Sequence, residues 1–177
     1  MVSFLAPTIR SLEASPATTA VFFCFDEICP LQGIVSLVDW RLHGHLSRMK
    51  IEGFFTGRRN IPLLMMPGRR LAVQYLLLIG LGPRDSFDAQ VFREAVSESL
   101  EIHRGLRVDT PAMMLPGRIE ALMQPEDAME NLIAAYEPYL ESARHLFLIE
   151  PPAAQKQMTP ALERWRLRRL IPGFGVA

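Results

Sequence analysis

Cysteine is scarce in this chain, which has only Cys24 and Cys29 among its 177 residues. Two cysteines five positions apart do not form a disulfide framework, and they suit a reducing compartment. They are also too few for a zinc cluster. Cys24 is expected inside a buried strand, while Cys29 in the following loop is the more reactive thiol. The sequence therefore predicts a cytoplasmic protein stabilised by its hydrophobic core.

The chain also lacks an excess of charge and any long apolar run. Its 19 basic and 19 acidic side chains give a formal net charge of zero, whereas dedicated nucleic-acid binders usually have a basic excess. Its apolar stretches are far too short to span a bilayer, and its first residues do not resemble a signal peptide. We therefore expect a soluble protein that binds neither nucleic acid nor membranes.

The motifs of common catalytic sites are missing as well. There is no His-Glu-x-x-His pattern, no Gly-x-Ser-x-Gly elbow and no Gly-Lys-Ser/Thr phosphate loop. His43 and His45 are two residues apart, so on a helix they would point about 200° apart and could not chelate one metal ion. Asp39, His43 and Ser47 share a helical face, but a catalytic triad normally draws on separate elements. No catalytic residue, metal ligand or cofactor is predicted.

What the sequence does contain is a series of apolar segments. The β-branched and aromatic run from Thr19 to Phe25 predicts a fully buried central strand. Two strands around the PGRR turn should form an antiparallel hairpin, because their connection is too short for a crossover. Pro111 removes a ladder donor, so its strand should lie at a sheet edge or bend there. The strands besides the central one are expected at 2–6, 61–66, 73–80, 106–115 and 144–150.

Helical patterns alternate with these strands. Apolar residues at steps of three and four predict one helix from about Val35 to a stop at Gly53. Two further helices should run from Asp85 or Ser86 to about Arg104 and onward from Pro125. This alternation predicts an α/β fold with three layers, α/β/α, around a mixed, mostly parallel sheet.

The amino-acid pattern of the chain changes at Pro151, which suggests a domain boundary there. Residues 1–150 would form the α/β domain, and 151–177 a linker followed by a C-terminal arm. Thr159 and Pro160 could open a short helix within this arm. The arm either docks on its own domain or reaches onto a partner.

Two places are candidates for binding a ligand. Asp26 and Glu27 follow the central strand, at the carboxyl end where open α/β sheets place ligands. Gly80 and Gly82 also lie between a strand and a helix, where backbone N–H groups can approach a phosphate. Pro83 begins the segment that replaces the third glycine of a dinucleotide fingerprint. The alternatives are a nucleotide or ADP-ribose-like ligand, or solvated loop acids beside an ordinary turn.

Five short motifs follow one another in an order that resembles a known family. They are Pro-Leu-x-Gly at Pro30 to Gly33, Leu-x-Asp-Trp-Arg-Leu at Leu37 to Leu42, Ser-Arg at Ser47 and Arg48, Gly-x-Phe-x-Gly at Gly53 to Gly57, and Leu-x-Gly-Leu-Gly at Leu78 to Gly82. As a set they resemble the N-terminal domain of the leucyl (cytosol) aminopeptidase family. The resemblance extends over roughly residues 1–150.

This resemblance implies a macro-domain-like fold and no enzymatic activity of these residues themselves. The family's two metal ions are held in a separate C-terminal domain, whose motifs do not occur in this sequence. The family's N-terminal domain helps to assemble hexamers, and in some members it has a role linked to nucleic acid, which the neutral charge disfavours here.

The resulting hypothesis is a non-catalytic interaction or assembly domain that binds itself or a separately encoded protein. Its polar interface contacts would come from an exposed helix face carrying Asp39, Arg41, Ser47 and Arg48. Phe54 and Phe55 would either anchor this interface or pack in the core. The alternative function is a macro-type module that binds a nucleotide or ADP-ribose-like ligand near Asp26, Glu27, Gly80 and Gly82.

Overall fold

A six-stranded mixed sheet forms the centre of the molecule in the computed structural model, which describes residues 1–27, 30–141 and 143–170. Its strand order is β1-β6-β5-β2-β4-β3, with parallel neighbours except for the antiparallel pair of β3 and β4. The expected hairpin is therefore confirmed. The strands are β1 (Val2–Leu5), β2 (Thr19–Phe25), β3 (Leu63–Met65), β4 (Tyr75–Gly82), β5 (Pro111–Met113) and β6 (Leu146–Ile149).

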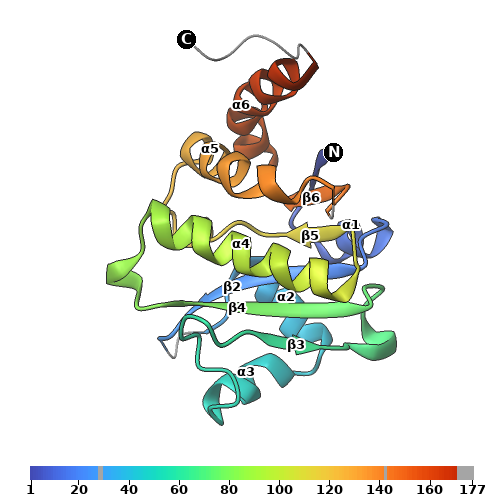
Figure 1. Ribbon diagram of the computed structural model, residues 1–177. Helices are drawn as coiled ribbons and strands as arrows, with labels where there is room; N and C mark the ends of the chain where they lie inside the picture. The colour runs from blue at the N-terminus through green and yellow to red at the C-terminus, as the bar shows by residue number, and fades with distance from the viewer. Residues whose placement is uncertain (28–29, 142, 171–177) are drawn as a thin grey trace.

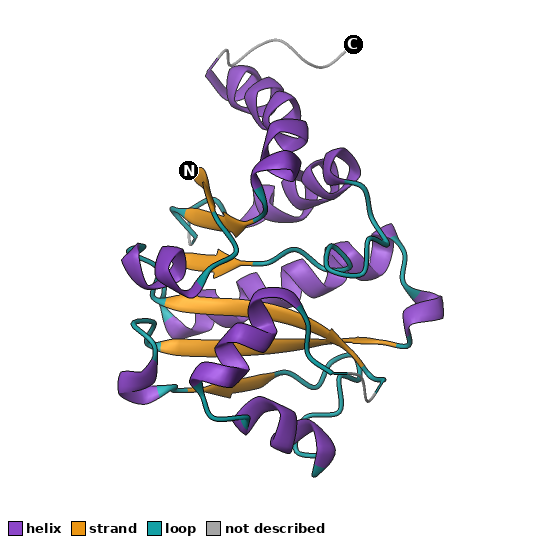
Figure 2. Ribbon diagram, turned by 180° about the vertical axis from the view of Figure 1, so that it is seen from behind, coloured by secondary structure: helices purple, strands orange, loops and turns teal. Residues whose placement is uncertain are grey.

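Helices cover both faces of this sheet, as Figures 1 and 2 show from opposite sides. One face packs against α4 (Ala89–Leu106) and α5 (Pro125–Tyr136), and the other against α2 (Gly33–Arg41) and α3 (His45–Ile51). The predicted three-layer α/β/α architecture is therefore confirmed. The remaining helical elements are α1 (Ile9–Ala14), α6 (Pro152–Leu170) and the 3₁₀ turns η1 (Gly68–Arg70), η2 (Arg84–Ser86) and η3 (Glu137–Tyr139).

The strand β2 joins the two hydrophobic layers. Every one of its residues is buried, as the continuous apolar run predicted. Val21 and Phe23 face the core beneath α4 and α5, whereas Phe22 and Cys24 face the core beneath α2. This alternation is the period-two geometry of a strand, and it explains why both faces of β2 must be apolar.

An edge position was one of the two alternatives predicted for the strand at Pro111, and it is wrong. β5 pairs with β2 on one side and β6 on the other, so it is an interior strand and not an edge strand. Pro111 is its first residue, a place where proline is tolerated because the ladder continues only beyond it.

The single helix expected from Val35 to Gly53 is two helices, α2 and α3. His43 and Gly44 between them have φ angles of 56° and 71°, which lie outside the right-handed helical region. The apolar stripe nevertheless continues across the break, since Leu42 and Leu46 are both buried. The hydrophobic spacing therefore identified the buried face correctly. It did not reveal that the backbone leaves the helical conformation at His43 and Gly44.

The segment expected to be a linker is helical. α6 runs continuously through Pro160 and packs against α5. Its apolar residues Met158, Leu162 and Trp165 are buried in the same core as α4 and α5. Residues 152–170 are therefore a docked part of the domain. In the described part of the chain, none of the helices combines the length and hydropathy needed to cross a bilayer.

Candidate functional site

The four residues predicted to bind a ligand do lie at one end of the sheet. Asp26 and Glu27 follow the carboxyl end of β2, and Gly80 and Gly82 form the end of its neighbour β4. A bulge in the pairing occurs there, because Cys24 is opposite Gly80 while Phe25 is opposite Gly82. The sheet thus brings together two sequence segments more than fifty residues apart.

The two glycines are covered by the chain's own backbone. A Cβ atom on Gly80 would lie 2.0 Å from the carbonyl oxygen of Arg58. The N–H of Gly82 donates to the carbonyl oxygen of Gly57 at 2.9 Å. These contacts use the close approach and the free amide that the sequence analysis assigned to a phosphate. Here the glycines allow residues 57–59 to cross β4.

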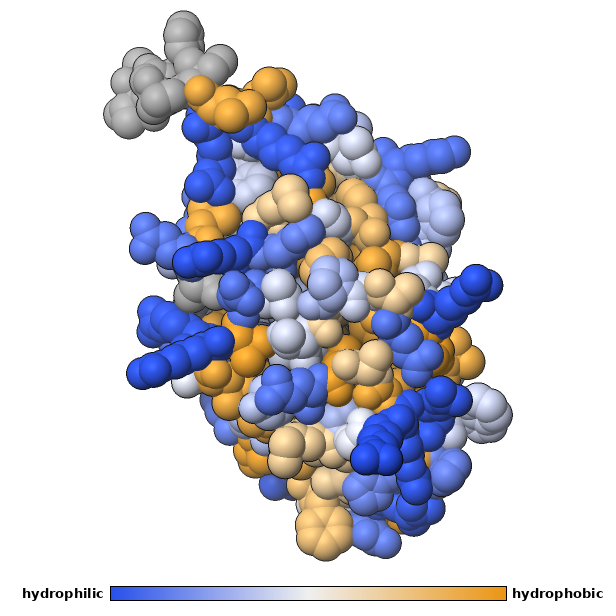
Figure 3. Space-filling view, turned by 90° about the vertical axis from the view of Figure 1, so that its right-hand side faces the viewer, coloured by the Kyte–Doolittle hydropathy of each residue, from blue (hydrophilic) through white to orange (hydrophobic). Residues whose placement is uncertain are grey.

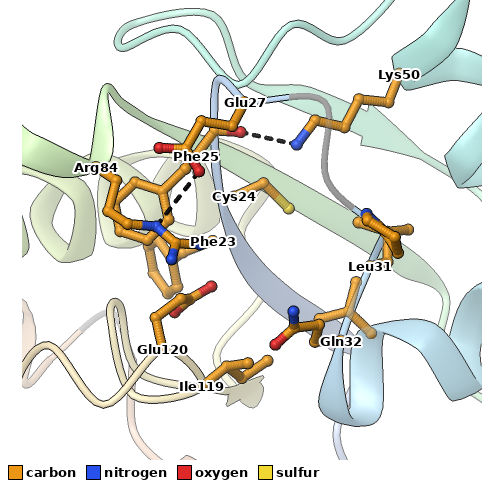
Figure 4. Close-up of a pocket in the computed structure, with 12 residues that line it drawn as sticks. Phe23, Cys24, Phe25, Glu27, Leu31, Gln32, Lys50, Arg84, Ile119 and Glu120 are labelled. Carbon is orange, nitrogen blue, oxygen red and sulfur yellow. Dashed lines mark hydrogen bonds and ion pairs between the residues drawn. The ribbon is translucent and has the colours of Figure 1, made fainter.

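The carboxylates of Asp26 and Glu27 belong to different hollows. Glu27 lines a small cavity, shown in Figure 4, together with Lys50, Arg84 and Glu120. Asp26 lines a separate depression beside Thr56, and Lys50 borders both. The two neighbouring acids therefore do not converge on one ligand.

Charged side chains are held in place around the small cavity. The Lys50 ammonium donates to the carbonyl oxygen of Phe25 at 2.8 Å, and the Arg84 Nε lies 3.3 Å from Glu27 Oε2 (Figure 4). The Arg84 guanidinium also lies over the Phe25 ring, 5.6 Å from its centroid. Burial raises the pKa of the Glu120 carboxyl, which lies on the same cavity.

The Cys24 thiol in this cavity is not an activated nucleophile. Complete burial raises its pKa to about 11, against a smaller lowering effect of Lys50. A thiol with that pKa is protonated at neutral pH and unreactive, because the thiolate is the nucleophile. The cavity itself measures about 40 Å³, well below the roughly 300 to 1,000 Å³ of typical ligand pockets.

A larger hollow lies at the carboxyl ends of β1, β5 and β6. It measures about 380 Å³ and is lined mainly by apolar residues, including Ile34, Met114 and Ile149. Arg118 and Glu150 supply its charges and form an ion pair of 3.2 Å, in which both side chains are largely buried. Burial raises the pKa of Glu150, and the adjacent Arg118 opposes this effect.

Sequence reasoning missed this second hollow. Glu150 directly follows the last strand, as Asp26 follows β2, so the same rule about carboxyl ends would have found it. Its partner Arg118 is 32 positions away, and no local pattern pairs the two. Ile119 and Gln32 line both hollows. Ile119 packs close to Gly33, where an added Cβ would lie 3.0 Å from its Cδ1.

The candidate interface residues divide into exposed and buried groups. Arg41, Arg48 and Phe54 are exposed, and Ser47 is half-buried. Phe54 has 70 % of its surface exposed, whereas Phe55 has 2 % and packs in the core. Asp39 was expected on an exposed helix face, and this expectation is wrong because the residue is 7 % exposed.

The burial of Asp39 has a structural reason. Its carboxylate accepts hydrogen bonds from the backbone N–H groups of Leu46 and Ser47, at 2.8 Å and 3.2 Å. These donors belong to the first turn of α3, which has no earlier helical turn to accept them. Asp39 thus caps a neighbouring helix from within α2.

Among residues 1–27, 30–141 and 143–170, no three His, Cys, Asp or Glu side chains are close enough to bind a metal ion. The predicted reactive thiol, Cys29, lies outside the described residues.

The sheet order, the two helical layers and the position of the hollows define an α/β domain of the macro-like type. A sequence model of the cytosol aminopeptidase family, N-terminal domain, matches residues 21–137. The chain therefore belongs to this family, which confirms the resemblance found in its motifs.

Similar proteins agree with this assignment. A probable cytosol aminopeptidase of Thermosynechococcus vestitus is 32 % identical over 99 residues, which make up 55 % of this chain and 20 % of that protein. The related protein of Synechocystis is matched over 19 % of its length. The chain thus matches about a fifth of the length of each of these two relatives.

Solved structures share the fold at low sequence identity. A mutant of tomato leucine aminopeptidase superposes with a TM-score of 0.63 at 12 % identity, covering 94 % of this chain and 36 % of that one. A Trypanosoma brucei macrodomain, solved in complex with ADP-ribose, gives a TM-score of 0.71 at 11 % identity, covering 91 % and 68 %. At these identities the likeness shows the fold alone.

Proposed function

We propose that this chain is a non-catalytic cytoplasmic interaction domain, which associates with itself or with a separately encoded protein. The observation that carries the proposal is a group of large apolar side chains left exposed around α2, α3 and β3. Trp40, Phe54 and Met66 have 75 %, 70 % and 72 % of their surfaces exposed. Trp40 lies in α2, Phe54 follows α3 and Met66 follows β3. Single exposed apolar residues are ordinary, and a group of large ones favours a binding surface.

The composition of this region supports the same function. Arg41 and Arg48 are exposed close to Trp40 along the chain, and Trp, Met and Arg are enriched in protein interfaces. Arg41 is held by a hydrogen bond to the carbonyl oxygen of Arg70 at 3.1 Å. An arginine positioned in this way loses less conformational entropy when a partner binds.

Light scattering of the purified protein, with and without co-expressed candidate partners, tests the proposal. We expect a mass above that of the monomer, and we expect Trp40→Ser with Phe54→Ser to weaken the association. Leu167→Ser is the matched control, since Leu167 is also exposed but lies on α6. Hydrolysis of leucine amides by the pure protein, dependent on Mn²⁺ or Zn²⁺ and abolished by a chelator, would contradict the non-catalytic role.

A second candidate function is binding of a nucleotide or an ADP-ribose-like molecule. The hollow beside Arg118 favours it, because its volume suits a small ligand and it lies at the carboxyl ends of the strands. Calorimetric titration with ADP-ribose tests it. If this function is correct, Ile119→Ala should strengthen binding by enlarging the hollow that Ile119 lines, whereas Ile34→Trp should block it. No heat of binding for the wild type or for Ile119→Ala would exclude it.

A further inference from the structure

The charges of this neutral chain are segregated. Residues 41–70 contain seven Arg or Lys residues and one acidic residue, Glu52. Residues 84–141 contain five Arg residues and twelve Asp or Glu residues. Two regions of opposite sign therefore exist in one molecule whose total charge is zero, and their positions in the fold decide what they can bind.

The basic region lies at one end of the sheet. It comprises α3, the edge strand β3, η1 and the connecting loops, which form the lower end of the molecule in Figure 1. We call this surface the basic end and define it by Arg41, Arg48, Lys50, Arg58, Arg59, Arg69 and Arg70. β3 pairs with β4 on one side only and is the last strand of the sheet.

Most of these cations lack an acidic partner among the residues that the structure describes. Arg48 and Arg70 donate to the carbonyl oxygens of His43 and Leu42, which hold the side chains without neutralising them. Arg41 forms an ion pair with Glu13 at 3.4 Å. Within the described ranges, the other six cations of the basic end have no ion pair. Lys50 and Arg59 donate to other groups of the protein. Arg48, Arg58, Arg69 and Arg70 are exposed, so their positive charge remains available to an external anion.

The acidic region adjoins the basic end, and the two meet where Arg59 lines one hollow together with Glu94 and Glu98. α4 and α5 lie over the sheet face that is turned towards the viewer in Figure 1, and η2 follows the end of β4. We call this surface the acidic face and define it by Asp85, Asp88, Glu94, Glu98, Glu101, Glu126, Asp127 and Glu130. Glu101 and Glu130 pair with Arg104 and Arg164. The other six carboxylates have no ion pair with any residue that the structure describes.

Both surfaces also carry exposed apolar side chains that an interface could bury. Ile51, Phe54 and Met66 lie among the cations of the basic end, and Leu122 lies just before α5 beside the acidic face. Figure 3 shows the same alternation on another side of the molecule, where apolar groups are separated by strongly hydrophilic ones. Burial of apolar area supplies affinity, while complementary charges select the orientation.

We infer that copies of this chain associate head to tail, with the basic end of one copy against the acidic face of the next. The inference rests on the proposed function and specifies its surfaces and its partner. A two-fold symmetric contact through the basic end would place arginines against arginines, which costs free energy. The contact therefore joins a different surface of each copy, the basic end of one and the acidic face of the other.

The same basic end could be thought to bind nucleic acid, whose backbone is polyanionic. Net charge governs the long-range approach of such a polymer, and a chain of zero net charge gives it no long-range attraction. A protein surface of limited extent and opposite charge needs only the local contact. The acidic face of a second copy has these properties.

Charge reversal with sedimentation velocity at 50 mM and 500 mM NaCl tests this arrangement. The end variant carries Arg58→Glu and Arg69→Glu, and the face variant carries Asp85→Lys and Glu94→Lys. All four residues are exposed, so the urea midpoints should remain near that of the wild type. We expect each variant to weaken association by about tenfold or more at low salt, and 500 mM NaCl to weaken that of the wild type.

The decisive measurements test whether association returns when the charges of the two surfaces are complementary again. A chain carrying all four reversals should regain association to within about threefold of the wild type, because its charges are exchanged between the two surfaces. A mixture of the end and face variants should likewise associate, because the unaltered basic end of one meets the unaltered acidic face of the other. Contact of the basic end with the basic end of another copy predicts no recovery in the four-site variant.

Four outcomes would overturn the inference. They are a wild type that remains monomeric at all concentrations, association unaffected by either reversal, no recovery in the four-site variant, and a monomer that binds single-stranded DNA through the basic end. A monomeric wild type leaves the proposed function standing through a separate partner. Metal-dependent peptide hydrolysis would refute the proposed function independently, so the two failures are distinguishable.

Discussion

The Asp39 carboxylate at the end of α2 accepts hydrogen bonds from both the backbone N–H and the hydroxyl of Ser47 in α3. This buried acid therefore fixes the angle between two helices. The continuous hydrophobic stripe had predicted a single helix in their place. The same pair places Arg41 and Arg48 on adjacent helices, at the surface to which we assign partner binding.

Removing this cap should destabilise the fold. In Asp39→Ala, the N–H groups of Leu46 and Ser47 lose their acceptor, and we expect a loss of about 1 to 3 kcal/mol in the free energy of unfolding. Ser47→Ala removes only the hydroxyl contact and should cost about 0.5 to 1.5 kcal/mol. Urea unfolding of both variants measures the difference. Equal losses would show that the backbone N–H bonds contribute little.

The glycine at the end of β4 should tolerate no side chain. Gly80→Ala places a Cβ against the carbonyl oxygen of Arg58, and we expect a loss of about 1 to 3 kcal/mol from overpacking. Gly105→Ala is the control, because no atom lies within 4 Å of its added Cβ. That change in α4 should stabilise the protein by about 0.5 to 1 kcal/mol. Thermal unfolding compares the two, and a neutral Gly80→Ala would contradict the packing of residues 57–59.

Docking of α6 should contribute to the stability of the whole domain. Trp165 is buried against α5, and its indole N–H donates to Glu137 at 3.0 Å. Trp165→Ala leaves a cavity and should cost about 3 to 5 kcal/mol. The exposed Trp40 provides the control, since Trp40→Ala should change stability by less than about 0.5 kcal/mol. If both variants unfold at the same urea concentration, residues 152–170 are not integral to the fold.

The buried His103 should make stability depend on pH. Burial lowers the pKa of its imidazole below the usual value of 6.5, against a smaller opposing effect of its hydrogen bond to Ser99. The unfolded chain therefore takes up the proton first as the pH falls. This contribution to stability is complete above about pH 6.5 and decreases from there towards the lower folded-state pKa.

Comparison with His103→Gln isolates this effect from other titrating groups. The free energy of unfolding of the wild type should fall relative to that of the variant by at most about 1.4 kcal/mol per pH unit within this window. Urea titrations between pH 7.5 and 5.0 measure the difference. A constant difference across this range would mean that burial does not shift the pKa of His103.

Local patterns predicted the elements whose burial is uniform or strictly periodic. Thr19–Phe25 forms the buried β2, and α5 begins at Pro125 with Glu126 and Asp127 in its first turn. The motifs likewise identified the family from residues that are near each other in the chain. Each of these features depends on the spacing of residues within one segment.

The interior position of β5, the break before α3, the docking of α6 and the pairing of Arg118 with Glu150 were decided by tertiary structure alone. The sequence by itself determined which segments are helices or strands and which of their faces are apolar, because periodicity is local. Which segment covers each face, and which donor meets each buried acceptor, depends on groups brought together only when the whole sheet forms.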